Sequence, residues 1–445
     1  MTPTQELAGF LVDAEVSEDH RAKAADYLLD TIGCILFGAE QPWSHRAADH
    51  ALRTGGDGGP CAVFGAGFST TSPMAAFANG ASAHAFELDD VHEEAISHPG
   101  AVVVPAALAI GTRIGASGRQ VLDAVAIGYE AMGRAGIAVG PVAHMLAGFH
   151  PTGQSGVFGA AAAVGRLLDF GPDTMTRALG IAATFSSGST EFSQSGGSTK
   201  RLHAGRASEG GLTAALLASD GLDGPTDGLA GRYGFCRTTT SQPAVHLLTE
   251  RLGERWMIDE ITVKPYAACS DIHPLIDAAI EIRDRGVDPD DIVEVHAEVP
   301  TKAAEQNALD GTTSVMAAQY SGPFNVAAAF LADPGDPATY TDDRISDPIL
   351  ADLQAKVSMV AADWCDDTYA WKMAGGLRVT CTDGTVHEAR VAGQRGSMHQ
   401  PLSRDELEDK FRRLAEGRAD ADAIIRFVRS LHGAGGLDDL QEALA

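Results

Sequence analysis

Apolar side chains recur at helical spacing through most of the first 255 residues. Ser17 can cap a helix whose first turn carries Glu18 and Asp19. The apolar residues that follow are spaced three, four and seven positions apart, which predicts one buried face made of Ala24, Tyr27, Leu28, Ile32, Ile35 and Leu36. Residues 118–134 repeat this pattern, and the small side chains of residues 156–165 would let neighbouring helices approach closely. We therefore expect residues 1–261 to be helical.

The hydrophobic pattern changes to a period of two after Lys264. Residues 292–299 alternate, which predicts a strand with Val293, Val295, Ala297 and Val299 on one face. Residues 377–381 alternate as well, and the Asp383-Gly384 pair predicts a hairpin turn into a strand over residues 386–391. Residues 271–285 are typical of a helix, so this part of the chain is expected to be α+β.

Helical spacing returns near the carboxyl end. Ser403 and Glu406 form a capping box, which predicts the start of a helix. The pattern thus predicts a mainly α protein with a large helical domain built from both chain ends (residues 1–261 and 395–445). A smaller α+β domain, residues 262–394, is inserted between them.

The net charge limits the partners of the chain. Its 445 residues carry 33 lysines and arginines against 60 aspartates and glutamates, a formal charge of −27. Such a chain repels phosphate backbones and anionic lipid surfaces, so we expect neither nucleic-acid nor membrane binding.

The amino terminus and the cysteines indicate a cytoplasmic protein. The first ten residues, MTPTQELAGF, lack the basic and apolar regions of a signal peptide. The six cysteines show no CxxC spacing, which argues against a zinc ribbon or a disulfide scaffold and favours a reducing compartment.

Three histidines directly precede prolines: His98, His150 and His273. Proline disfavours helical geometry in the residue before it, so each histidine is expected at a helix edge or in a loop. Catalytic side chains are often presented at such places. A histidine at a helix boundary without function is the alternative.

The segment of residues 84–100 concentrates imidazoles and carboxylates. Glu87 and Asp90 lie here with His84, Asp89 and His98. Carboxylates orient imidazoles and tune their proton affinity, which favours acid–base chemistry. A metal site is an alternative, although the spacing matches no HExxH motif. A solvated acidic loop is another.

A basic segment lies at residues 198–206. Lys200, Arg201, His203 and Arg206 could bind substrate carboxylates, or they could be solvated cations at the start of a helix. No GxxxxGK, GxGxxG or GxSxG motif is present, which argues against a phosphate loop, a dinucleotide fold and a hydrolase elbow.

Two further segments complete the candidates. Lys264, Tyr266 and His273 lie at the expected domain boundary, where ligand clefts often form. Tyr320 lies among turn residues in 318–324 and is the weaker signal.

In order along the chain, ELDD…HPG, HPTG, TKRLHAGRA, VKPYAACSDIHP, AQYSGPFNVA and PLSRDELEDKF resemble motifs of the MmgE/PrpD family. The resemblance implies that the inserted α+β domain is a lid, that the protein is a homodimer, and that it works without metal or cofactor on a small polycarboxylic acid. It matches His98, His150, Lys200 and Lys264 to the family's catalytic residues. The substrate-binding residues that it implies are Glu87, Asp90, His203, Tyr266, His273 and Tyr320.

The resemblance also bounds the reaction. It implies a lyase, of the 2-methylcitrate dehydratase type or the cis-aconitate decarboxylase type. An epimerase of an iminodisuccinate-like amino acid and a non-catalytic helical binding protein are the alternatives. Compared with cis-aconitate decarboxylase, Glu87 replaces an aspartate, Val91 replaces a threonine, and the spacing from Asp90 to His98 is one residue longer. We therefore expect a pocket of different shape.

Overall fold

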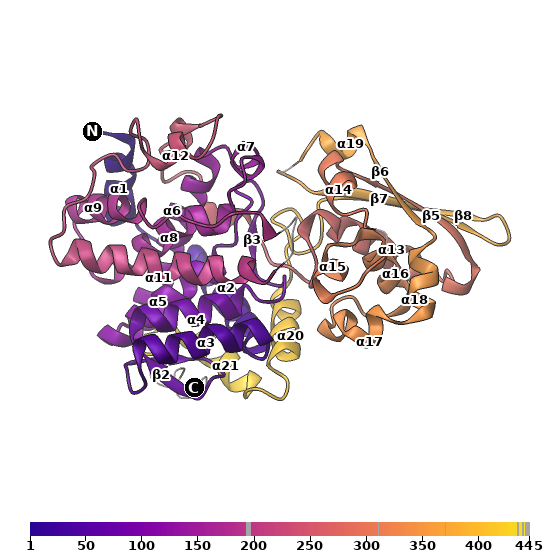
Figure 1. Cartoon of the computed structure of the whole chain (residues 1–445), viewed down its shortest axis with the longest axis horizontal. Coiled ribbons are helices and arrows are strands. Elements are labelled where there is room, and N and C mark those ends of the chain that lie inside the picture. Colours follow the sequence, from indigo (N-terminus) through magenta and orange to yellow (C-terminus); the bar gives the residue numbers. More distant parts are fainter. Residues whose placement is uncertain (193–196, 310, 370, 434–435, 438–439, 441–445) are drawn as a thin grey trace. The chain divides into compact units, whose positions relative to one another are not determined.

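The chain divides into two compact units. A computed structural model describes residues 1–192, 197–309, 311–369, 371–433, 436–437 and 440. The first unit comprises Met1–Ile261 and Arg404–Ala445, so it is assembled from both chain ends, and the second comprises Thr262–Ser403. Figure 1 shows the helices of the first unit in indigo to pink, together with the yellow carboxyl-terminal helices.

The first unit is almost entirely helical. Its main helices are α1 (Pro3–Asp13), α2 (Glu18–Ala39), α3 (Pro42–Gly55), α4 (Ser72–Ala83), α5 (Gly100–Ile114), α6 (Gly118–Ala138), α7 (Pro141–Leu146), α8 (Pro151–Leu167), α9 (Pro172–Ala182), α11 (Thr199–Ser219), α12 (Phe235–Thr238), α20 (Arg404–Ala415) and α21 (Ala421–Ser430). Its short strands are β1 (Cys61–Val63), β2 (Phe68–Thr70) and β3 (Val91–His92), and β4 (Ile261–Thr262) lies where the chain leaves the unit. The expected buried face of α2 is confirmed.

Small residues bring the central helices close together, as residues 156–165 predicted. A Cβ atom on Gly211 of α11 would lie 2.3 Å from the backbone oxygen of Val157 on α8. A Cβ atom on Gly205 would lie 2.3 Å from the oxygen of Phe77 on α4. Only glycine permits these approaches, and they place the start of α11 beside α4 and α8.

The carboxyl-terminal helix α20 packs against α2 near the start of the chain. Lys410 on α20 lies 2.6 Å from the buried Asp30 of α2, and its Nζ also donates to the backbone oxygen of Leu88 at 2.8 Å. One buried lysine thus links the two ends of the chain to the loop between α4 and α5.

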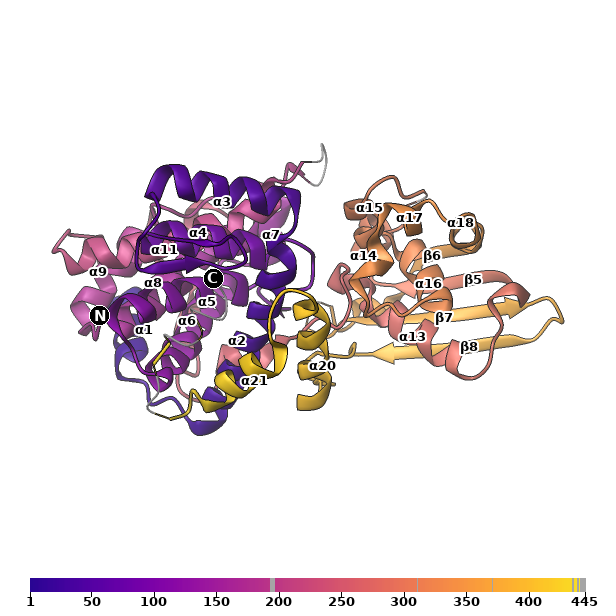
Figure 2. The ribbon, with the colours of Figure 1, turned by 90° about the horizontal axis from the view of Figure 1, so that it is seen from below.

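The second unit contains a four-stranded sheet covered by helices (Figure 2). The strands β5 (Ile292–Val299), β6 (Val357–Ala361), β7 (Ala374–Cys381) and β8 (Val386–Ala392) are ordered β6-β5-β7-β8. β5 and β6 are parallel and the other pairs are antiparallel. The helices are α13 (His273–Asp284), α14 (Thr301–Gln306), α15 (Val315–Tyr320), α16 (Gly322–Leu331), α17 (Asp342–Ile345), α18 (Pro348–Gln354) and α19 (Asp363–Asp366).

One detail of the predicted strands was wrong. Val293 was expected on the buried face of β5, but its side chain is 52% exposed, whereas Val295, Ala297 and Val299 are buried. The pairing with β7 shifts register between Ile292 and Glu294. A bulge at this point changes the face to which the side chains before it point. The hairpin at Asp383-Gly384 is confirmed, with Gly384 at φ 82°.

The mainly α fold class is confirmed. Among the described residues, no helix combines the length and the apolar character that a membrane crossing requires.

Candidate active site

The loop between α4 and α5 carries the imidazoles and carboxylates of residues 84–98. His84, Asp89 and Asp90 are each 1% exposed, and His98 is 9% exposed. These residues are therefore part of the interior, and the alternative of a solvated acidic loop was wrong. Buried groups of this kind need partners, because burial without hydrogen bonds is costly.

Asp89 lies between two of the histidines. Its Oδ2 is 2.6 Å from Nδ1 of His84 and 3.3 Å from Nδ1 of His98, and the two rings are 4.8 Å apart. Burial alone would raise the pKa of Asp89, but the two imidazoles outweigh this and hold its pKa well below the usual range. Burial lowers the pKa of His84 to about 4 despite the neighbouring carboxylate. At neutral pH the structure thus holds an ionised Asp89 beside a neutral His84.

The adjacent Asp90 has different partners. Its Oδ1 accepts a hydrogen bond from the backbone N–H of Gly100 at 2.8 Å, and its Oδ2 accepts one from the hydroxyl of Tyr129 at 2.5 Å. Burial raises the pKa of Asp90 to about 8, against the opposing effect of the Tyr129 hydrogen bond. Asp90 therefore ties the loop to α5 and α6. Its role as a substrate ligand stays a prediction.

His150 and His203 form a second imidazole pair. His150 precedes the first turn of α8, and its Nδ1 lies 3.0 Å from Nδ1 of His203 on α11. Burial lowers the pKa of both rings, for His203 to about 4. The ring of His150 is also 5.8 Å from that of His84. Four imidazoles thus follow one another in the first unit, in the order His98, His84, His150, His203.

Lys200 and Glu87 form a buried ion pair beside the imidazoles. Lys200 lies in the first turn of α11 and is 4% exposed, and Glu87 is 2% exposed. Glu87 has a φ of 58°, a left-handed conformation that is unfavourable for a residue with a Cβ atom. Strain of this kind often occurs at functional sites. The carboxylate of Glu87 compensates the ammonium charge of Lys200, which the sequence analysis proposed as a ligand of substrate carboxylates.

The remaining candidates belong to the second unit. Tyr266 donates from its hydroxyl to Oδ1 of Asp277 at 2.7 Å, and its ring is 5.2 Å from that of His273. Nε2 of His273 lies 3.1 Å from the backbone oxygen of Ala268, so this nitrogen carries the proton. Lys264 is 1% exposed, and Tyr320 is the last residue of α15.

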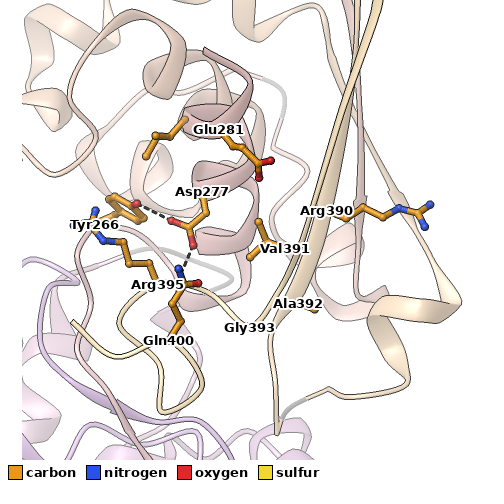
Figure 3. Close-up of a pocket in the computed structure, with 10 residues that line it drawn as sticks. Tyr266, Asp277, Glu281, Arg390, Val391, Ala392, Gly393, Arg395 and Gln400 are labelled. Atoms are coloured by element: carbon orange, nitrogen blue, oxygen red, sulfur yellow. Dashed lines mark hydrogen bonds between the residues drawn. The ribbon is translucent and has the colours of Figure 1, made fainter. Parts of the chain in front are cut away.

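A pocket of about 410 Å³ lies beside Tyr266 in the second unit. Figure 3 shows Asp277 at its centre, where its Oδ2 accepts a hydrogen bond from the backbone N–H of Arg395 at 2.8 Å. The side chain of Arg390 points away from this carboxylate. Tyr266 is thus oriented by Asp277, a residue that the sequence analysis did not single out.

Within the described ranges of the chain, His84, Asp89 and His98 are the residues whose donor atoms could hold a metal, and these atoms lie within 4.8 Å of one another. Nδ1 of His98 is also 2.8 Å from the backbone oxygen of Asp90, which can only accept a hydrogen bond. This nitrogen therefore carries a proton and has no lone pair for a metal. The arrangement suits hydrogen bonding better than metal ligation.

His84, Asp89 and Lys410 were not among the predicted site residues. The first two lie in the segment of residues 84–100 that the sequence analysis identified, but spacing does not show which carboxylate faces which ring. Lys410 lies on α20, more than 300 residues from the loop that it holds. Its signals were the PLSRDELEDKF motif that contains it and its place in an amphipathic helix.

Comparison with known proteins identifies the family of this chain. Residues 5–248 match the MmgE/PrpD N-terminal domain, and residues 266–432 match the MmgE/PrpD C-terminal domain. Cis-aconitate decarboxylase of Aspergillus terreus is 27% identical, over 98% of this chain and 93% of the relative. The cis-aconitate decarboxylase-like protein oryM of Aspergillus oryzae is 28% identical over 99% and 96%. Cis-aconitate decarboxylase of Homo sapiens is 26% identical over 98% and 90%.

The two domain matches follow each other in the order expected of one protein and leave few residues unmatched. The relatives align over nearly their whole length as well. This chain therefore belongs to the MmgE/PrpD family.

Proposed function

We propose that this lyase transfers a proton next to a carboxylate of a small di- or tricarboxylic acid. The observation that supports the proposal is the row of four imidazoles, three of them buried and that of His203 half-buried, beside the Lys200–Glu87 pair. Neutral imidazoles accept protons near neutral pH, and a lysine ammonium can stabilise the negative charge that develops on a substrate carboxylate.

The first reaction that we propose is decarboxylation of a cis-aconitate-like acid, because the relatives carry that name. In this reaction the C–C bond to the departing carboxylate breaks and CO2 leaves. The electron pair forms a new double bond, and the pair of the old double bond takes a proton from an acid of the site. The Lys200 ammonium supplies this proton, or His98 or His150 supplies it after first taking up a proton of its own.

Dehydration of a hydroxy acid of the 2-methylcitrate type is the second candidate. A base removes a proton from the carbon next to a carboxylate, and the hydroxyl leaves as water after it takes a proton from an acid. At Glu87 a carboxylate longer than the aspartate of cis-aconitate decarboxylase lies against Lys200, so we expect the site to accept an acid that differs from cis-aconitate in size or branching.

Lys264, Tyr266, His273 and Tyr320 are proposed to bind carboxylates of the substrate, on the basis of their family motifs. Lys264→Met should lower turnover at least about 100-fold, because a positive charge proposed to bind a substrate carboxylate is lost. Lys356 of the same unit donates to the backbone oxygen of Ile292, and Lys356→Met is the matched control.

Proton NMR in deuterated water tests the reaction. Purified protein is incubated separately with cis-aconitate, citrate, 2-methylcitrate and an iminodisuccinate-like amino acid. We expect CO2 release with a deuterated methylene product, or loss of water with a new olefinic signal. Rapid α-deuteration of the amino acid with inversion, and no product from any of the other acids, would make the protein an isomerase. Turnover of no compound would favour a binding protein.

The remaining expectations are proposals as well. A homodimer is tested by light scattering at several protein concentrations. Chemistry that relies on side chains alone is tested by elemental analysis of active protein, where a stoichiometric metal would contradict it. A cytoplasmic location is tested by cell fractionation.

A further inference from the structure

The carboxylate of Asp89 serves two imidazoles at once. Its Oδ2 lies 2.6 Å from Nδ1 of His84 and 3.3 Å from Nδ1 of His98. All three residues are buried. Asp89 belongs to the loop and does not come from a helix that faces the rings. All three residues thus come from one segment, and the contacts of Asp89 with both rings fix the rings relative to each other.

The hydrogen bonds determine the tautomer of both rings. His98 lies 2.8 Å from the backbone oxygen of Asp90, so its Nδ1 carries the proton. His84 faces an ionised carboxylate, so its Nδ1 carries the proton too. Each ring therefore keeps the lone pair on Nε2. In the part of the chain that the structure describes, Nε2 of His84 has no hydrogen-bond partner although it is buried.

A third histidine of the same loop shows the opposite arrangement. Nδ1 of His92 accepts a hydrogen bond from the backbone N–H of Ala95 at 3.2 Å, so its lone pair is used by the backbone. Its protonated Nε2 is directed towards Glu260, 3.6 Å away. His92 is as buried as His84. Burial alone therefore does not produce the tautomer of His84 and His98.

We propose that Asp89 is a positioning residue that holds His84 and His98 in the same tautomer, so that the site offers two Nε2 proton acceptors, and that His84 is the second of these. The proposal rests on the proposed function. When either Nε2 takes a proton from a substrate carbon, the C–H electron pair stays on the substrate. The positive charge of the resulting imidazolium is stabilised by Asp89, and the imidazolium then gives the proton to the departing hydroxyl or to solvent, which restores the neutral ring.

Other charged groups also face these rings. The charged and titratable groups nearest to His84, His98 and Asp89 are Glu87, Lys200, Asp90, His150, His203 and the Asp30–Lys410 pair. The lysines of the two ion pairs are each compensated by a carboxylate. Asp89 is the carboxylate in direct contact with both rings.

The test compares Asp89→Asn, Asp89→Glu and His84→Gln with His92→Gln, on the full-length protein. The amide introduced by Asp89→Asn can donate to Nδ1 of His84 and so reverse the tautomer. We expect kcat of Asp89→Asn to fall at least about 100-fold with KM within about threefold. The acid limb of the kcat–pH profile of Asp89→Asn should also move to lower pH, because the imidazolium loses the carboxylate that stabilises it. Asp89→Glu should recover part of kcat. The kcat of His84→Gln should fall at least about tenfold, and the kcat of His92→Gln should stay within about twofold of that of the unaltered protein.

A substrate-independent readout separates this proposal from the proposed function. Nitrogen-15 NMR of labelled histidines reports which ring nitrogen carries the proton, whatever reaction the protein performs. We expect Nδ1–H for His84 and His98, and Nε2–H for His92. A tautomer with Nε2–H at His84 would overturn the proposal even if the lyase activity is found. Unchanged kcat and an unchanged acid limb in Asp89→Asn would overturn it as well. If Asp89→Asn does not fold, equal kcat values of His84→Gln and His92→Gln would overturn the proposal.

Discussion

The Lys200–Glu87 pair is a buried ion pair to which we also assign a chemical role. Lys200→Met removes the charge proposed to stabilise the transition state and leaves Glu87 buried without its ammonium partner. We expect kcat to fall about 100-fold or more and the free energy of unfolding to fall by about 3–5 kcal/mol. Steady-state kinetics and urea unfolding measure the two effects.

A double variant separates the two roles. Lys200→Met combined with Glu87→Gln removes the unpaired charge, so we expect stability to recover and turnover to stay low. Turnover close to that of the unaltered protein in the double variant would contradict a chemical role for Lys200.

His92 should make stability depend on pH without affecting turnover at neutral pH. Burial lowers its pKa to about 4, whereas in the unfolded chain its pKa is about 6.5. Between these values the unfolded state binds more protons, so stability falls as the pH falls from about 6.5 towards 4. Between pH 7 and pH 5, the free energy of unfolding of His92→Gln should therefore fall by about 2 kcal/mol less than that of the unaltered protein. Urea unfolding at both pH values measures this, with exposed His45→Gln as the control. Equal losses in all three proteins would contradict it.

At the scale of elements, α20 is fixed to α2 and to the active-site loop by Lys410. Lys410→Met leaves Asp30 buried and uncompensated and removes the hydrogen bond to Leu88, which lies between Glu87 and Asp89. We expect the free energy of unfolding to fall by about 3–5 kcal/mol, with a loss of turnover. Lys23 pairs with Asp259, but both side chains are about two-fifths exposed, so Lys23→Met should cost less than about 1 kcal/mol. Equal losses in the two variants would show that the buried pair has no special role.

The division into units predicts which segments fold alone. Thr262–Ser403 is continuous and contains a complete four-stranded sheet with its helices. We expect this segment alone to unfold cooperatively, as followed by circular dichroism during heating. Residues 1–261 alone lack α20 and the partner of Asp30, so we expect them to be less stable or to aggregate. Cooperative unfolding of residues 1–261 with unchanged stability would contradict the role given to α20.

At the scale of the whole molecule, the charge of −27 should oppose the capture of an anionic substrate. Raising the ionic strength from about 10 mM to about 150 mM shortens the screening length from about 30 Å to about 8 Å. We therefore expect kcat/KM for a tricarboxylate to rise with salt while kcat stays constant. A fall in kcat/KM over the same range would show that local positive charge controls capture.

Local features of the fold were predictable because they depend on residues close together in the chain. The helical spacing identified the buried face of α2, and the alternation with the Asp383-Gly384 turn identified β7 and β8. The His-Pro pairs marked the starts of α5, α8 and α13, since proline fits the first turn of a helix, where no backbone N–H partner is needed. The bulge in β5 was missed because it arises from pairing with residues of β7 almost 90 positions away.

The sequence by itself determined the kinds of residue at the site and the segments that carry them. Only the tertiary structure decided their partners. Asp89 and Asp90 are neighbours in the chain, yet one faces two imidazoles and the other binds Gly100 and Tyr129. Glu87 meets Lys200 from a segment 113 residues away. Such pairs depend on how α4, α5, α8 and α11 pack, and close helix packing is set by glycines and side-chain shapes throughout the core, which no local pattern in the sequence records.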